Sequence, residues 1–183
     1  MPDRLPSWSD TPTKTAVVEF VAAVTDPGSD EVVPEVDRVA VFDNDGTSST
    51  ENPGIPPHQI IGSRSTVTFQ IGDTRPELIK GTDLAVIDDG PQKPITIHQA
   101  VGQRPIFADG NTDGDLPMLQ WTAGNSGRTL KLAVHHTGAE RESTYDVDPV
   151  LGSGTEKVIA AAAGGAWTVV DVAKDWATVY APD

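Results

Sequence analysis

The chain has no cysteine among its 183 residues, so disulfides and thiolate metal sites are excluded. Basic residues are also scarce: 13 Lys+Arg stand against 27 Asp+Glu, which gives a formal net charge of −14. This charge argues against nucleic-acid and anionic-membrane partners and favours a metal cation. No apolar run reaches the roughly 18 residues of a membrane-spanning helix. The N-terminus lacks the basic start and apolar core of a signal peptide, so the expected location is the cytoplasm, while the oligomeric state is left open.

The apolar pattern predicts one α/β domain over residues 1–183. A helix is expected over Pro12–Thr25, where apolar residues recur every three or four positions. Further strands are expected at 38–42, 105–108, 130–134 and 167–170, and further helices near 95–101, 116–122 and 155–163. This alternation predicts a Rossmann-like, mainly parallel sheet with helices on both faces. Residues 65–71 and 84–87 are expected to form a small antiparallel hairpin around a turn region at 72–81.

Two aspartates stand at the end of the first predicted strand. The apolar run at 38–42 is followed by Asp43 and Asp45, and then by Gly46 and Thr47. In open α/β sheets ligands bind beyond the carboxyl ends of the strands, so both carboxylates are expected where chemistry is usually done. Carboxylates this close repel each other unless a cation lies between them, and oxygen-only ligation suits Mg²⁺. One carboxylate is then placed to attack a phosphorus atom while the other moves a proton.

A second acidic loop follows the predicted 105–108 strand. Its sequence from Asp109 is Asp-Gly-Asn-Thr-Asp-Gly-Asp. If the two strands are neighbours in the sheet, both acidic loops meet at one cation. Lys93 lies between them in the sequence, at the expected start of a helix, and a lysine in this crevice would neutralise the charge of a transferring phosphoryl group.

These segments resemble motifs of the haloacid dehalogenase superfamily, most closely its phosphoserine-phosphatase-like branch. Phe42-Asp43-Asn44-Asp45-Gly46-Thr47 is similar to the first motif, Lys93 to the third, and residues 110–118 to the acidic fourth. The resemblance covers the chain from the first helix to Trp176. It implies a Mg²⁺-dependent phosphomonoester hydrolase (a phosphatase) that acts on a small phosphorylated substrate through an aspartyl-phosphate intermediate.

The same resemblance implies roles for single residues. Asp43 would be nucleophile and metal ligand, and Asp45 would be general acid/base and would give the metal its backbone carbonyl. Thr47 would support the loop. The fourth motif commonly begins Gly-Asp, whereas this chain has Gly-Asn there, so the remaining metal ligand is left open between Asn111, Asp113 and Asp115.

The segment 48–92 is short for this family. Only 45 residues separate Thr47 from Lys93, and they are predicted to form a loop and a hairpin in place of the helical cap and the second motif, a strand ending in Ser or Thr. Ser63 is the nearest match to that hydroxyl. Two alternatives to a phosphatase follow: a catalytically impaired, cation-binding remnant of the fold, or, less favoured, a calcium-binding module.

The calcium alternative rests on residues 109–120. Asp109, Asn111, Asp113 and Gly114 match the first half of an EF-hand loop, but Gln120 stands where that loop has a bidentate glutamate. The preceding segment is also predicted to be a strand, whereas an EF-hand loop follows a helix.

Overall fold

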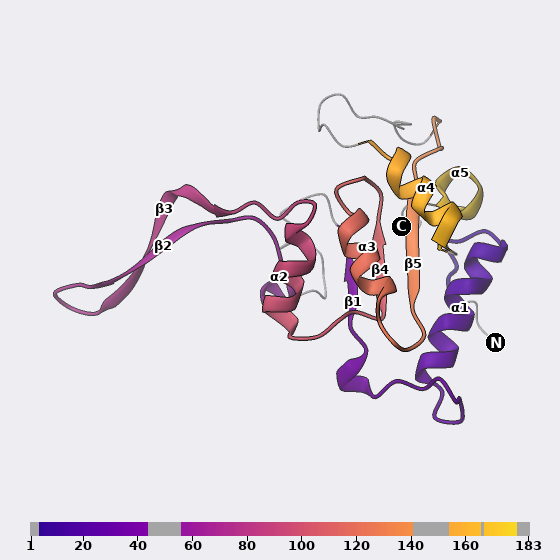
Figure 1. The fold of residues 1–183 in the computed structure, drawn as a ribbon, viewed down its shortest axis with the longest axis horizontal. Coiled ribbons are helices and arrows are strands. Elements are labelled where there is room, and N and C mark those ends of the chain that lie inside the picture. Colours follow the sequence, from indigo (N-terminus) through magenta and orange to yellow (C-terminus); the bar gives the residue numbers. More distant parts are fainter. Residues whose placement is uncertain (1–3, 44–55, 141–153, 166, 179–183) are drawn as a thin grey trace.

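The computed structural model describes residues 4–43, 56–140, 154–165 and 167–178. Its centre is a parallel sheet of four strands, in the order β1-β4-β5-β6 (Figure 1). The strands are β1 (Ala40–Phe42), β4 (Phe107–Gly110), β5 (Leu130–His135) and β6 (Thr168–Asp171). All three pairings are parallel, so the predicted mainly parallel α/β sheet is confirmed.

Helices cover both faces of this sheet, as the alternating pattern predicts. On one face α1 (Pro12–Thr25) and the start of the short helix α5 (Val172–Asp175) pack into a core with Leu130, Leu132 and Val170. On the other face α2 (Gln92–Val101), α3 (Leu116–Ala123) and α4 (Glu156–Gly165) pack over Ala108 and Ala133. These two alanines are fully buried, and their small size suits a face covered by three helices.

Helix α1 has the bounds that its sequence predicts. Thr11 caps it, because its Oγ1 accepts a hydrogen bond of 3.4 Å from the backbone N of Lys14, and proline at the first position needs no backbone donor. Phe20 and Val24 are buried at 4% and 3% exposure, so the apolar stripe packs on the sheet. Single-turn 3₁₀ helices, η1 (Glu35–Asp37) and η3 (Pro57–Gln59), lie between α1 and the hairpin.

The antiparallel hairpin is longer than the sequence predicts. It consists of β2 (Arg64–Ile71) and β3 (Pro76–Val86), and it projects from the body of the molecule (Figure 1). The expected turn region at 72–81 is wrong, because a tight turn at 72–75 suffices: the backbone N of Gly72 donates to the carbonyl of Arg75 at 3.2 Å. Gly81 is a strand residue beside an irregularity in the pairing, where an added Cβ would lie 2.2 Å from Thr66 Oγ1.

Other differences are shifts of a few residues. The predicted 105–108 strand begins two residues later, at Phe107, and the 167–170 strand runs one residue later. Helix α5 was not expected from the sequence pattern because it has only four residues. Within the described ranges, no helix is both long and apolar enough to cross a membrane.

Candidate active site

Asp43 stands at the carboxyl end of β1, beside the end of β4. Phe42 pairs with Asp109 in the parallel register, and the backbone N of Asp43 then donates to the carbonyl of Asp109 at 3.1 Å. Asp43 and the acidic loop that begins at Asp109 therefore lie at the ends of neighbouring strands, at the same edge of the sheet. The carboxylate of Asp43 is 15% exposed, so it remains in contact with solvent.

Lys93 joins the two loops. Its Nζ donates to Asp43 Oδ1 at 2.7 Å and also to Asp115 Oδ1, so one ammonium group pairs with two carboxylates. The local backbone places it there: Gly90 has a positive φ of 52°, and the backbone N of Lys93 donates to the carbonyl of Gly90 at 3.1 Å as α2 begins. Thr96, buried in the next turn, donates to the carboxylate of Asp88 and anchors the segment that leads into the helix.

Asp115 is completely buried and is fixed by its other oxygen. Asp115 Oδ2 accepts from the backbone N of Asn111 at 3.0 Å, from the backbone N of Thr112 at 2.9 Å and from Thr112 Oγ1 at 3.2 Å. Gly110 makes this position possible, since a Cβ there would lie 2.5 Å from the Cβ of Asp115. The carboxylate is thus a rigid anchor for Lys93.

The electrostatics of the cluster follow from this packing. Burial alone lowers the pKa of Lys93, but the charge of Asp115 and hydrogen bonds to Asp115 and Asp43 outweigh it, so the pKa lies above its ordinary value. Lys93 therefore stays cationic at neutral pH. Burial, together with the charges of Asp43 and Asp115, raises the pKa of Asp109 to about 7. Asp109 is thus a carboxyl group at this edge of the sheet that binds a proton near neutral pH.

The remaining residues of the fourth-motif segment point to different partners. Asp113 Oδ1 accepts from the backbone N of Lys157 and Val158 at 2.9 and 3.0 Å, so this carboxylate caps the first turn of α4. Asn111 is buried at 6% exposure, and its Nδ2 lies 3.4 Å from His136 Nε2. The expected strand before this loop, in place of the helix of an EF-hand, is confirmed as β4.

Asp45 and Thr47, the other two predicted catalytic residues, lie outside the described residues. Of the predicted set, Asp43 and Lys93 are brought together. Among the residues that the structure describes, no three His, Asp or Glu side chains gather closely enough to hold a metal ion. Two features of the site were missed: the pairing of Asp115 with Lys93, and the raised pKa of Asp109. The sequence signal for both residues is their position. Asp109 directly follows the apolar run of a predicted strand, and Asp115 lies in the acidic loop after it.

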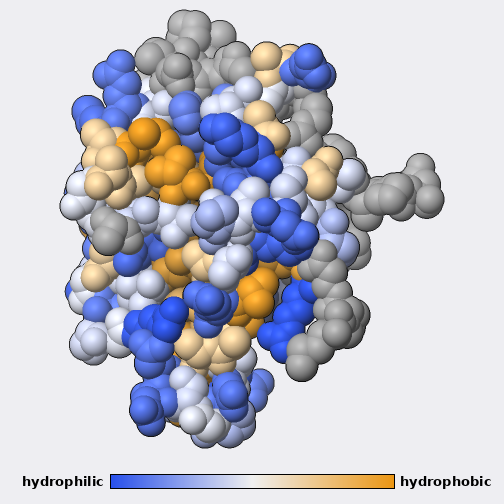
Figure 2. Space-filling view, turned by 90° about the vertical axis from the view of Figure 1, so that its right-hand side faces the viewer, coloured by the Kyte–Doolittle hydropathy of each residue, from blue (hydrophilic) through white to orange (hydrophobic). Residues whose placement is uncertain are grey.

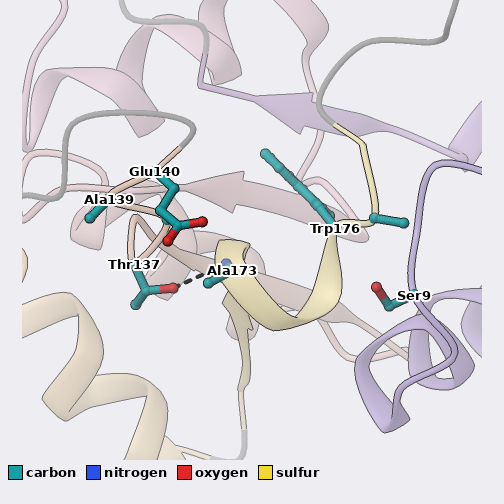
Figure 3. A pocket seen from close by; sticks show the side chains of 8 residues that line it. Ser9, Thr137, Ala139, Glu140, Ala173 and Trp176 are labelled. Atoms are coloured by element: carbon teal, nitrogen blue, oxygen red, sulfur yellow. Dashed lines mark hydrogen bonds between the residues drawn. The ribbon is translucent and has the colours of Figure 1, made fainter.

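A separate hollow of about 530 Å³ lies beyond β5 and β6 (Figure 3). Thr137, Glu140 and Trp176 line it, and Thr137 Oγ1 accepts from the backbone N of Ala173 at 3.1 Å. None of the Asp43, Lys93 and Asp115 cluster contributes to its walls. Comparison of the whole chain with protein-family models and with curated proteins finds no match.

Proposed function

We propose that the protein is a Mg²⁺-dependent phosphomonoester hydrolase of the haloacid dehalogenase type, acting on a small phosphorylated substrate. The observation that carries the proposal is Lys93, whose ammonium contacts the strand-end carboxylate of Asp43 and the buried carboxylate of Asp115. A nucleophilic carboxylate beside a permanent cation, at the carboxyl ends of adjacent parallel strands, suits phosphoryl transfer. The order of the motifs along the chain gives independent support.

The residues present fit a Mg²⁺ ion. Mg²⁺ binds through one or two protein oxygens and keeps several waters, so it does not need three protein carboxylates. Asp43 offers a partly exposed carboxylate, and the amide oxygen of Asn111 is a suitable second ligand from the neighbouring loop. Asp45 would add its backbone carbonyl. Asp113 is the weaker candidate, since one of its oxygens caps α4. When bound, the cation would offset the negative charge on the phosphoryl oxygens.

In the first step Asp43 attacks the phosphorus atom in line with the leaving oxygen. The new bond joins the carboxylate to phosphorus, and the bond from phosphorus to the alcohol oxygen breaks. Asp45 gives its proton to that oxygen, so the product leaves as a neutral alcohol. Lys93 remains charged throughout and stabilises the phosphoryl group as negative charge spreads over its oxygens.

In the second step water hydrolyses the aspartyl phosphate. Asp45, now ionised, removes a proton from the water, whose oxygen attacks phosphorus. The bond from phosphorus to the Asp43 oxygen breaks and releases inorganic phosphate. Asp43 is again a carboxylate and Asp45 again carries a proton, which restores the starting state.

The impaired remnant is the alternative that one observation favours. The hydroxyl of Ser63 accepts a hydrogen bond of 2.9 Å from the backbone N of Asp88 at the base of the hairpin, which is a structural role. The sequence between Thr47 and Lys93 predicts neither a second-motif strand nor a helical cap, and without them phosphoryl transfer loses positioning and charge stabilisation. We therefore expect slow turnover, with preference for small aryl phosphates whose leaving groups need little protonation.

The test compares phosphate release by the wild type, by Asp43→Asn and by Asp30→Asn, each with Mg²⁺ and an aryl phosphate. Asp43→Asn keeps the shape of the side chain but removes the nucleophilic charge, so its rate should fall to the uncatalysed level. Asp30 is exposed, and the same change there should leave the rate unaltered. Equal rates in all three proteins would refute the phosphatase proposal and favour the catalytically impaired, cation-binding remnant of the fold.

The preference of the protein for Mg²⁺ or Ca²⁺ distinguishes the phosphatase hypothesis from the calcium-binding hypothesis. Mg²⁺ should raise the melting temperature of the wild type more than Ca²⁺ does, because a site with few protein oxygens and several waters suits the smaller ion. The shift should shrink in Asp43→Asn. A larger shift with Ca²⁺ that persists in Asp43→Asn would favour the loop at 109–120 as a calcium site.

A further inference from the structure

The hairpin of β2 and β3 carries an apolar face that the rest of the described molecule leaves uncovered. In the antiparallel register Phe69 pairs with Leu78, and Val67 and Ile71 lie two residues to either side on the same face. These four residues, the hairpin face, are 58–81% exposed. Neither hydrophobic core cluster includes a residue of the hairpin, in agreement with its projection from the body (Figure 1).

This face differs from ordinary exposed apolar surface. On the side of the molecule seen in Figure 2, hydrophobic residues form small patches separated by polar and charged ones. On the hairpin, four large apolar side chains are instead contiguous along two paired strands. An isolated two-stranded hairpin is only marginally stable in water, and a contiguous apolar surface of this kind marks an interaction site.

The charge of the hairpin indicates which kind of partner can approach it. Residues 64–86 contain three basic and three acidic residues, namely Arg64, Arg75, Lys80, Asp73, Glu77 and Asp83. The hairpin is therefore neutral, and the formal charge of −14 resides on the remainder of the chain. Two hairpins can meet without repulsion while the acidic bodies stay apart at opposite ends. An anionic membrane or a nucleic acid would be repelled by the same bodies.

We infer that the hairpin face binds the hairpin face of a second copy of this chain, forming a symmetric dimer. Two small sheets packed face to face about 10 Å apart would bury both sets of apolar side chains. Four large side chains and their neighbours on each copy bury on the order of 1,000 Å² in total, the size at which specific but weak interfaces begin. The dimer is thus concentration-dependent.

Sedimentation velocity over roughly 1–300 µM chain tests the dimer, because an interface of this size is expected to be populated in that range. The wild type should pass from the 19.3 kDa monomer to twice that mass. Raising the salt concentration should strengthen the dimer, since it screens repulsion between the bodies. Phe69→Thr with Leu78→Thr should weaken association at least tenfold, whereas Ile79→Thr on the opposite face should not.

Cross-linking provides a second measurement that does not depend on destabilising the hairpin. The chain has no cysteine, so a single one can be placed at will. With a short bis-maleimide Leu78→Cys should form covalent dimers, because facing sheets about 10 Å apart leave its thiols too distant for a direct disulfide but within reach of the reagent. Ile79→Cys, on the other face, should form few. A wild type that is monomeric throughout, or equal cross-linking from both positions, would overturn the inference and point to a different protein as the partner of this face.

Discussion

Replacement of Asp109 by asparagine should remove a pH-dependent cost to stability. The carboxyl group of Asp109 has its pKa raised from 3.8 to about 7, by burial first and then by the charges of Asp43 and Asp115. Between those pH values the folded protein holds a proton that the unfolded chain has released. The contribution of Asp109 to the free energy of unfolding is therefore most favourable below pH 3.8. It declines as the pH rises from there and has been lost once the pH passes about 7. Asparagine has the same shape and no charge, so it avoids this loss.

The size of the effect follows from the rise in pKa. At about 1.4 kcal/mol for each tenfold change in proton affinity, a rise from 3.8 to about 7 sets an upper bound of about 4 kcal/mol. Asp109 is only partly buried, and contact with solvent reduces the effective cost to roughly 2 kcal/mol. For a chain of this length, that difference raises the melting temperature by roughly 4–8 °C.

Thermal melts between pH 4.5 and 8.5 in the presence of EDTA provide the assay. The melting temperature of Asp109→Asn should exceed that of the wild type at pH 8, and the gap should narrow as the pH falls toward 4.5. The matched control is Asp30→Asn, on the exposed surface, which should follow the wild type throughout. Parallel curves for the wild type and Asp109→Asn would show that this carboxyl group is ionised in the folded protein across the range, and would refute the argument.

Three further substitutions test the contacts around the site. Lys93→Met should destabilise the protein by about 3 kcal/mol at pH 8, measured by denaturant unfolding, because buried Asp115 loses its counter-charge; an unchanged midpoint would contradict this. Gly110→Ala should cost about 1–3 kcal/mol in the same assay, since its Cβ would collide with Asp115, which is packed and hydrogen-bonded. Asp113→Ala should lower stability by about 1 kcal/mol through loss of the α4 cap while retaining the shift in melting temperature caused by Mg²⁺; loss of that shift would instead make Asp113 a metal ligand.

Much of the fold was predictable because its signals are local. Thr11, Pro12 and the apolar stripe of α1 act within one helix, and each strand of the sheet is marked by its own apolar run. The approach of Asp43 to Lys93 was also predictable, from two acidic strand ends and a lysine at the start of a helix. These features depend on residue type and order, which a single sequence displays.

The rest depends on contacts between distant segments. The role of Asp113 as a cap was not predictable, because its partners are backbone groups at residues 157 and 158, on a different element. The length of β3 was underestimated because Gly81 suggests a turn, whereas in the structure it is a strand residue that Thr66 of the paired strand approaches closely. The proton affinity of Asp109 likewise arises from burial and from two neighbouring charges that only the folded chain brings together.

The most direct test of Asp43 as a nucleophile is a single-turnover reaction with an aryl phosphate and Mg²⁺, quenched in acid and analysed by peptide mass spectrometry. In the wild type, the peptide that contains Asp43 should gain the mass of one phosphoryl group, which hydroxylamine should remove, because an acyl phosphate is reactive toward it. Asp43→Asn should show no such gain. Product formation by the wild type without any phosphorylated Asp43, or with the phosphoryl group on another residue, would contradict the proposed mechanism.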